Sequence, residues 1–104
     1  MMETKKTITR PESEIKLYFR RPWNETRGDS FDHWGTSFWY FETDKKGKIF
    51  RQIEAYENGK KLKYSLTFPA DKYGQLEKRL LNLINFSTFQ IKQIDFEKIW
   101  IRSE

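Results

Sequence analysis

An Asn-Gly pair, Asn58-Gly59, constrains the fold of this 104-residue chain more than any other local feature. It lies between two runs, 48–57 and 60–68, in which apolar and polar side chains alternate. A period of two is typical of strands, and an Asn-Gly pair supplies the positive φ angles that a two-residue type I′ turn requires. The sequence therefore predicts a β-hairpin that turns at Asn58-Gly59.

This turn sets the register of the hairpin and places one charged side chain on its apolar face. With Glu57 opposite Lys60, Arg51 pairs with Leu66 on the apolar face. A guanidinium group in that position must form an ion pair, extend to solvent or contact a ligand. We interpret Arg51 as the partner of a carboxylate on the C-terminal helix, with Glu97 as the natural candidate, and rank this above anion binding.

The neighbouring segments extend the hairpin into a sheet. Residues 37–44 alternate in the same way and connect to the strand at 48–57 through Lys45-Lys46-Gly47, which is typical of a three-residue loop with glycine in the left-handed position. A short fourth strand is expected at 89–91. The prediction is a four-stranded, mainly antiparallel sheet with a central three-stranded meander. The sequence does not determine the order of the strands.

One further strand is predicted near the N-terminus. Residues 14–20 alternate apolar and polar side chains, and Pro22 is expected to end the strand because proline lacks the N–H that a ladder requires. The sequence leaves open whether this strand pairs beside the one at 37–44. Residues 1–13 are polar and charged and are expected to form a flexible arm, so that 14–104 make up a single α+β domain.

Two helices are expected to cover one face of this sheet. The segment 75–85 carries four aliphatic side chains at helical spacing. These are Leu76, Leu80, Leu83 and Ile84. Asp95 is a candidate N-cap for a short C-terminal helix, and Phe96, Ile99 and Trp100 share one side of that helix. The predicted fold class is therefore α+β.

The composition limits the chemistry that the chain can perform. The sequence contains no cysteine, which excludes disulfides and thiolate sites and agrees with a reducing compartment. No apolar run approaches the roughly 20 residues of a membrane-spanning helix, and no apolar stretch of a signal peptide is present at the N-terminus. We expect a cytoplasmic protein without a membrane partner. The net charge of +5 is spread along the chain, which weakens a nucleic-acid interpretation.

His33 is the only histidine and the one candidate for acid-base catalysis. Asp32 precedes it, but neighbouring side chains in a loop seldom face each other, and no serine lies in a nucleophile-elbow pattern. The histidine and the scattered carboxylates also lack the spacing of a metal site. We therefore predict no catalytic residue, no metal site and no cofactor, and interpret His33 as a solvated or loop-packing residue.

Aromatic residues, 17% of the chain, supply most of the candidate binding residues. Three of them lie in the loop at 22–37 and either pack back onto the sheet or contact a partner. Five others are expected on the outer face of the sheet, where a partner or the chain's own arm and loop can cover them. Together with Arg51, the candidates are Trp23, Phe31 and Trp34 of the loop and Tyr18, Phe38, Tyr40, Phe50 and Tyr56 of the sheet.

Short motifs are distributed over residues 38–101. They are a tyrosine-acid-aspartate strand, an Arg-x-Ile-Glu strand, a glycine turn and a closing Phe-Glu-x-x-Trp helix, with the signature positions Arg51, Ile53, Glu54, Gly59, Phe96, Glu97 and Trp100. Together they resemble a family of small uncharacterised bacterial proteins. The resemblance implies a compact α+β domain with an immunity-type or accessory role in a toxin system, and it supplies no catalytic residue. The tryptophan-rich loop before Phe38 departs from the family's simpler first hairpin, so a function of that loop need not transfer.

These observations favour a non-enzymatic protein-binding domain of bacterial origin, an immunity or accessory protein whose partner is a toxin. The alternative is a module that binds single-stranded nucleic acid through the aromatic sheet face and basic side chains. Oligonucleotide binding that weakens steeply with salt would identify it. A small enzyme that uses His33 ranks third. The sequence leaves the partner and the oligomeric state open.

Overall fold

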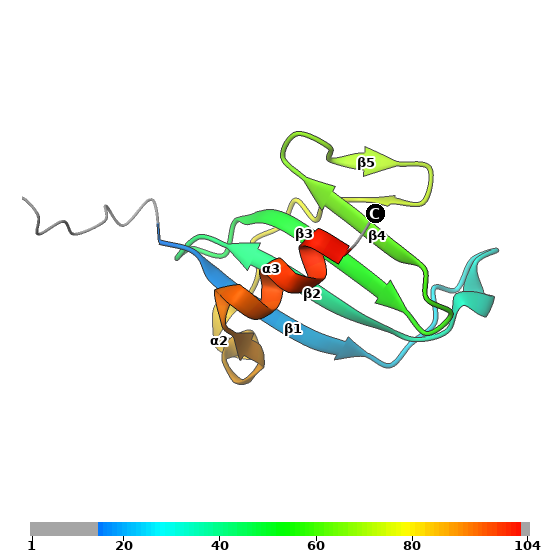
Figure 1. Cartoon of the computed structure of the whole chain (residues 1–104), viewed down its shortest axis with the longest axis horizontal. Helices are drawn as coiled ribbons and strands as arrows, with labels where there is room; N and C mark the ends of the chain where they lie inside the picture. Colours follow the sequence, from blue (N-terminus) through cyan, green and yellow to red (C-terminus); the bar gives the residue numbers. More distant parts are fainter. Residues whose placement is uncertain (1–14, 103–104) are drawn as a thin grey trace, which may run out of the picture.

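The computed structural model describes residues 15–102, and its centre is a five-stranded antiparallel sheet (Figure 1). The strands lie in the order β4-β3-β2-β1-β7. Their bounds are Leu17–Trp23 for β1, Ser37–Thr43 for β2, Ile49–Tyr56 for β3, Lys61–Ser65 for β4 and Gln90–Ile91 for β7. The predicted α+β class is confirmed, with five strands in place of four because β1 joins the meander beside β2. The predicted arm, residues 1–13, lies outside the described part of the chain.

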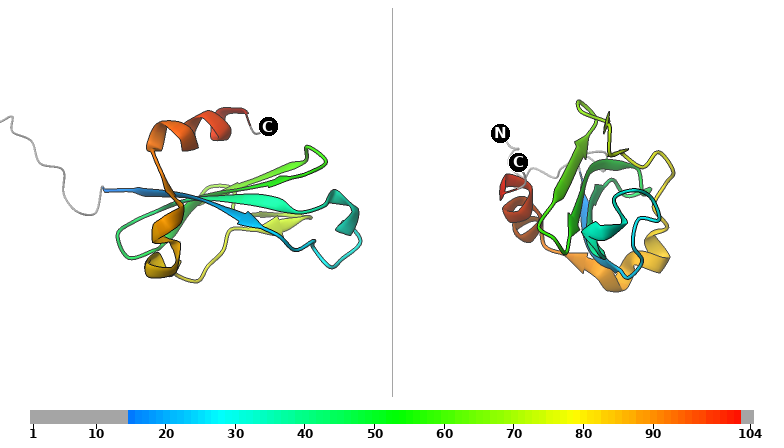
Figure 2. Two further views of the ribbon diagram at one scale, coloured as in Figure 1. Left: turned by 90° about the horizontal axis from the view of Figure 1, so that it is seen from below. Right: turned by 90° about the vertical axis from the view of Figure 1, so that its right-hand side faces the viewer.

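The two faces of the sheet are covered by different elements (Figure 2). Helix α3, Gln93–Arg102, lies over one face. The segment between β4 and β7 covers the other face with a small second sheet, β5 Ala70–Asp71 and β6 Gly74–Gln75, and the short helix α2, Leu83–Phe86. The expected placement of both helices on one face is wrong, because the chain passes from one face to the other at β7, which pairs with the edge of β1.

The helix predicted over residues 75–85 is also wrong. Only Leu83–Phe86 is helical, and the side chains of Leu80 and Ile84 are 66% and 85% exposed. Of the four aliphatic residues predicted to share one side of this helix, Leu76 is buried in the core. Its N–H donates to the Pro69 carbonyl at 2.7 Å. Backbone bonds to other segments therefore hold an extended chain where local spacing favoured a helix.

The hairpin at Asn58-Gly59 forms, but its loop has three residues. Tyr56 N–H donates to the Lys60 carbonyl at 2.9 Å, and Gly59 alone of the loop has a positive φ, of 95°. Asn58 contributes its side chain instead, because its Oδ1 accepts from Lys60 N–H at 2.9 Å. The predicted pairing of Glu57 with Lys60 is therefore wrong by one residue. A type I turn followed by a left-handed glycine closes a hairpin as readily as the two-residue turn.

A β-bulge changes the register of the other hairpin. Thr43 pairs with Ile49 and Glu42 with Arg51, so Phe50 is passed over in the ladder. The predicted loop at 45–47 is confirmed, since Asp44 N–H donates to the Lys48 carbonyl at 3.0 Å and Gly47 has a φ of 95°. Beyond the bulge, Trp39 pairs with Glu54 and Phe41 with Gln52, whereas a regular ladder from the same loop would place Trp39 beside Ile53 on the opposite face.

Strand β1 continues past Pro22 to Trp23, which pairs with Ser37. The prediction that Pro22 ends the strand is wrong. Strand β7 pairs only with Tyr18 and Phe19, so within residues 15–102 no strand pairs with the later part of β1 on that edge. A proline at an open edge removes no ladder bond, and the strand can extend toward the loop that carries the tryptophans.

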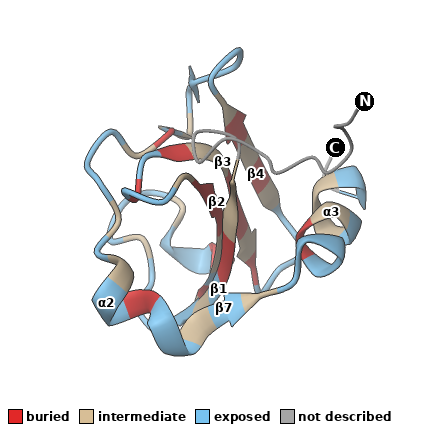
Figure 3. Ribbon diagram, turned by 90° about the vertical axis from the view of Figure 1, so that its left-hand side faces the viewer, coloured by how far each residue is buried: buried red, intermediate tan, exposed pale blue. Residues whose placement is uncertain are grey.

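Buried side chains form two clusters, one on each face of the sheet. Figure 3 shows buried residues along the strands of the sheet between them. The larger one lies opposite α3 and includes Phe19, Phe41, Tyr64, Leu76 and Phe86. The smaller one lies under α3, where Phe96 and Ile53 are fully buried and Tyr18 is 6% exposed. Both faces are thus apolar, and the aromatic residues predicted for one outer face are divided between them, with Tyr18 and Tyr40 under α3 and Tyr56 in the larger cluster.

Candidate functional site

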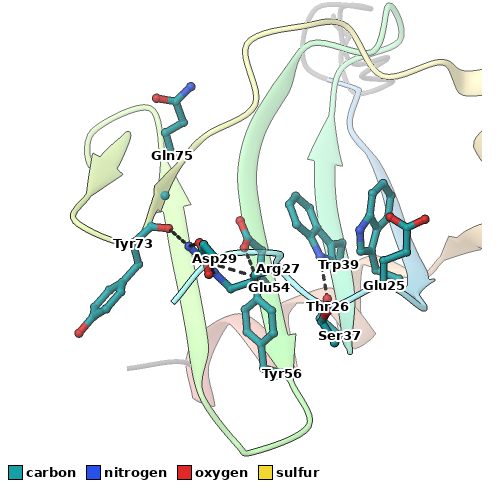
Figure 4. Close-up of a pocket in the computed structure, with 12 residues that line it drawn as sticks. Glu25, Thr26, Arg27, Asp29, Ser37, Trp39, Glu54, Tyr56, Tyr73 and Gln75 are labelled. Atoms are coloured by element: carbon teal, nitrogen blue, oxygen red, sulfur yellow. Dashed lines mark hydrogen bonds and ion pairs between the residues drawn. The ribbon is translucent and has the colours of Figure 1, made fainter. Parts of the chain in front are cut away.

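A pocket opens at the end of the sheet where β1 leads into the loop toward β2 (Figure 4). Its volume is about 380 Å³, within the range of small-molecule sites in proteins. The walls come from that loop, from β2 and β3, and from the β5-β6 hairpin. Charged and aromatic side chains dominate the lining. They include Glu25, Arg27, Trp39, Glu54, Tyr56 and Tyr73.

The register of β2 and β3 assembles the floor of this pocket. Trp39 pairs with Glu54, and Ser37 pairs with Tyr56. Positions two apart in a strand point to the same face, so these four side chains form one surface. The one-residue bulge is required for this arrangement, because it brings Glu54 to the face of Trp39.

Glu54 is a nearly buried carboxylate in the floor of the pocket, with 4% of its surface exposed. Its Oε1 accepts from the Tyr56 hydroxyl at 2.7 Å and its Oε2 from Gln52 Nε2 at 2.9 Å. Gln52 is itself held by Gln75 O and Glu77 N–H. Burial raises the pKa of Glu54 above its ordinary value, and the hydrogen bonds from Tyr56 and Gln52 oppose that shift.

Arg27 fastens the loop to the rest of the pocket (Figure 4). Its guanidinium binds Asp29 through Nε at 3.1 Å and Nη2 at 2.9 Å, and Nη2 also donates to the Tyr73 carbonyl at 2.7 Å. Its Nη1 lies 3.5 Å from the Tyr56 hydroxyl. The hydrogen bonds from Arg27 lower the pKa of Asp29. Arg27 and Asp29 therefore form a charge-matched pair at the rim of the pocket.

Two tryptophans form the mouth of the pocket. The ring centroids of Trp23 and Trp39 are 5.4 Å apart, and Trp39 Nε1 donates to Ser37 Oγ at 2.9 Å. Trp23 is 40% exposed, so part of its indole is accessible to solvent. A large apolar ring that is partly exposed next to a pocket is a common feature of binding surfaces.

Comparisons with known proteins identify no relative. No family model, curated protein or solved structure matches the chain. Over residues 15–102 there is no group of three or more histidine and acidic side chains that could hold a metal ion, and no helix there is long and apolar enough to cross a membrane. The resemblance to a bacterial family stays a prediction.

The loop aromatics predicted as candidates separate into two roles. Trp34 is 7% exposed and lies 5.3 Å from Tyr56 and 4.8 Å from Phe31 between ring centroids. These rings pack back onto the sheet, whereas Trp23 stays partly exposed at the pocket. His33 is exposed on the 3₁₀ turn Asp32–Trp34.

The sheet aromatics predicted as candidates do not form one surface. Tyr18 is buried 5.3 Å from Phe96, and Tyr56 lies on the opposite face in the larger core. Phe38 is 38% exposed and lies under the guanidinium of Arg20, 3.9 Å from its ring centroid. The two remaining rings also contact cations. Arg20 donates to Tyr40, and Lys16 and Lys48 lie over Phe50.

Arg51 forms the predicted ion pair with Glu97, with Nη2 2.6 Å from Oε2. A second carboxylate, Glu42, which is 8% exposed, binds Arg51 Nε at 2.7 Å. The guanidinium also lies 4.8 and 4.9 Å from the ring centroids of Phe96 and Trp100. This side chain connects α3 to the sheet and does not line the pocket, and its predicted role in binding stays a prediction.

Sequence reasoning missed Arg27, Trp39 and Glu54 as pocket residues. The spacing Arg27-Gly28-Asp29 is a usable local signal, because residues two apart on either side of a glycine can form an ion pair across a tight turn. Glu54 gives no such signal, since an acid in a strand is ordinarily solvated. Its burial depends on the bulge and on the β5-β6 hairpin that packs beside it.

We expect Glu54→Gln to fold and to become more stable than the native chain as the pH rises. The raised pKa means that burial favours protonated Glu54, so its contribution to stability is present below its unfolded pKa and is lost as the pH rises through the folded pKa. The uncharged amide avoids this loss. Urea unfolding from pH 4.5 to 8 should give free energies within about 1 kcal/mol of native at the acid end. The exposed Glu25→Gln is the control, and a difference that does not grow with pH would contradict the prediction.

Proposed function

We propose that this chain is a non-enzymatic protein-binding domain that receives a side chain of its partner in the pocket beside Trp23 and Trp39. The partly exposed indole of Trp23, whose ring centroid lies 5.4 Å from that of Trp39 in a pocket also lined by Arg27, is the observation that carries the proposal. Tryptophan and arginine are the residue types most enriched among the side chains that dominate binding energy at protein interfaces. The pocket volume of about 380 Å³ is large enough to accommodate an inserted side chain.

The proposal has a narrower form that rests on the resemblance of residues 38–101. In that form the chain is a bacterial immunity or accessory protein, and its partner is a toxin. A cytoplasmic location is part of the proposal, and the cysteine-free sequence supports it. Where a toxin gene adjoins the gene for this chain, its product is the first partner to assay.

Selection of peptides from a phage-displayed random library tests the general form. The purified chain should select peptides that bind in 150 mM salt, and Trp23→Ala should weaken them about tenfold, since a central aromatic truncation costs roughly 1 to 2 kcal/mol. Phe38→Ala is the matched control, because Phe38 is exposed to a similar degree on the other face. Isothermal calorimetry gives both affinities.

Two outcomes would contradict the proposal. One is a set of peptides whose binding depends on Phe38 and is unaffected by Trp23→Ala. The other is the absence of any selected peptide together with oligonucleotide binding that falls steeply with salt, which would favour the nucleic-acid alternative.

A further inference from the structure

We infer that the pocket is a cation site, built for the ammonium or guanidinium group of a lysine or arginine side chain on the partner. This inference rests on the proposed function and adds the chemistry of the inserted side chain. It is carried by the distribution of charge in the pocket, by the bonding of Glu54 and by the aromatic wall.

The lining of the pocket is acidic, although the chain as a whole carries a net charge of +5. Three carboxylates, Glu25, Asp29 and Glu54, accompany one guanidinium, that of Arg27. Arg27 is bound to Asp29 through two of its nitrogens, which balances its charge, and it reaches Glu54 only through the Tyr56 hydroxyl. Glu25 and Glu54 are left as the charges that an incoming group meets, and they attract a cation.

Glu54 is held by donors that carry no charge. Within the described residues, the groups that reach its two oxygens are the Tyr56 hydroxyl and the Gln52 amide. A nearly buried carboxylate in such surroundings gains more from a cationic partner than an exposed one does, because water no longer screens the attraction. Each oxygen keeps a lone pair for a further donor.

The wall beside Glu54 suits the rest of a long cationic side chain. Trp39 pairs with Glu54 across the two strands, and its ring centroid lies 5.4 Å from that of Trp23. Indole faces attract ammonium and guanidinium groups and also pack against the methylene stem of lysine or arginine. An aliphatic stem along the two indoles therefore leads its charged end toward Glu54.

Titration with blocked amino acids tests the assignment without any partner protein. The probes are Nα-acetyl-lysine methylamide and Nα-acetyl-arginine methylamide, and the neutral comparison is the norleucine derivative. Nuclear magnetic resonance should show shifts of the Trp39 indole N–H and of the Glu54 amide at millimolar lysine or arginine. The norleucine derivative should bind at least fivefold more weakly, as expected for a cation–π contact assisted by a carboxylate.

Variants locate the site. Glu54→Gln should weaken lysine binding at least fivefold while the variant stays folded, and Asp95→Asn, which changes an acid on α3 outside the pocket, should leave it unchanged. Equal binding of norleucine, shifts that map outside the pocket, or full binding by Glu54→Gln would each overturn the assignment.

If selected peptides require Trp23 but the cationic probes do not bind, the cation assignment fails and the proposed function stands. If the probes bind at Glu54 and no peptide is selected, the proposed function fails instead.

Discussion

Replacing Arg51 with methionine is expected to lower the free energy of unfolding by about 3 to 5 kcal/mol, the cost of breaking a buried ion pair by removing one partner. The guanidinium binds Glu42 and Glu97 and lies between two rings of α3. Methionine fills much of the same volume but leaves Glu42 as an unpaired, 8% exposed carboxylate. Urea unfolding followed by circular dichroism and by tryptophan fluorescence measures the loss.

Two further variants separate charge from packing. Arg79→Met removes an arginine whose side chain is 87% exposed and paired with Glu77, and it should change stability by less than about 0.5 kcal/mol. Adding Glu42→Gln to Arg51→Met should recover part of the loss, because the second change removes the unpaired charge. A native-like free energy for Arg51→Met alone, with α3 still docked, would show that the pair does not hold the helix.

Glu42 also connects this ion pair to the first strand. The Tyr18 hydroxyl donates to Glu42 Oε2 at 3.0 Å, and burial together with this hydrogen bond raises the pKa of Tyr18 to about 12. The network therefore joins β1, β2, β3 and α3 beneath one helix. A substitution at Arg51 therefore removes contacts to both β2 and α3.

The alternation of side chains within one strand was predictable, and the pairing between strands was not. Arg51 and Ile53 lie on the same face of β3, under α3, as their alternation predicted. The ion pair with Glu97 was therefore predicted correctly, although the predicted pairing of β3 with β4 is wrong by one residue. A slip in β4 does not move the side chains of β3. It does move those of β4, and Lys63 rather than Tyr64 lies opposite Ile53.

Loop conformation explains the errors in register. Asn58 can satisfy a turn through a positive φ or through its side chain, and the sequence does not distinguish the two. The bulge at Phe50 also lacks a local signal in the sequence. It places Ile49 and Gln52 on the same face, and this arrangement is favourable only because of what packs against that face. At Gly47 the requirement is tertiary as well, since a Cβ there would collide with the Leu81 carbonyl oxygen.

The candidate site was predictable only at its edge. Trp23 and Tyr56 were among the predicted binding residues, but the pocket also needs Arg27 from the loop, Glu54 from β3 and Tyr73 from the β5-β6 hairpin. These segments meet because the chain forms the short β5-β6 hairpin and then continues in an extended conformation. The helix predicted over residues 75–85 does not contain this arrangement. No motif in the sequence marks such a meeting, since its parts are separated by about 20 residues or more along the chain.

The second large effect is expected for Phe96→Ala, which should lower the free energy of unfolding by about 3 to 5 kcal/mol. Phe96 is fully buried, and it is the one buried side chain of α3. Its ring lies 5.3 Å from Tyr18 and 6.1 Å from Trp100 between centroids. Ile101→Ala, on the same helix at 69% exposure, should change stability by less than about 0.5 kcal/mol. Urea unfolding measures both variants.

Combining Phe96→Ala with Arg51→Met shows whether the helix docks as a unit. The guanidinium and the ring lie 4.8 Å apart and hold the same helix, so each single change already loosens contacts that the other would remove. The double variant should therefore lose less free energy than the sum of the two single losses. Hydrogen exchange of α3 amides should accelerate in both single variants before the sheet opens. Additive losses, or α3 amides that stay as protected as the sheet in Phe96→Ala, would mean that the helix is held by contacts other than this cluster.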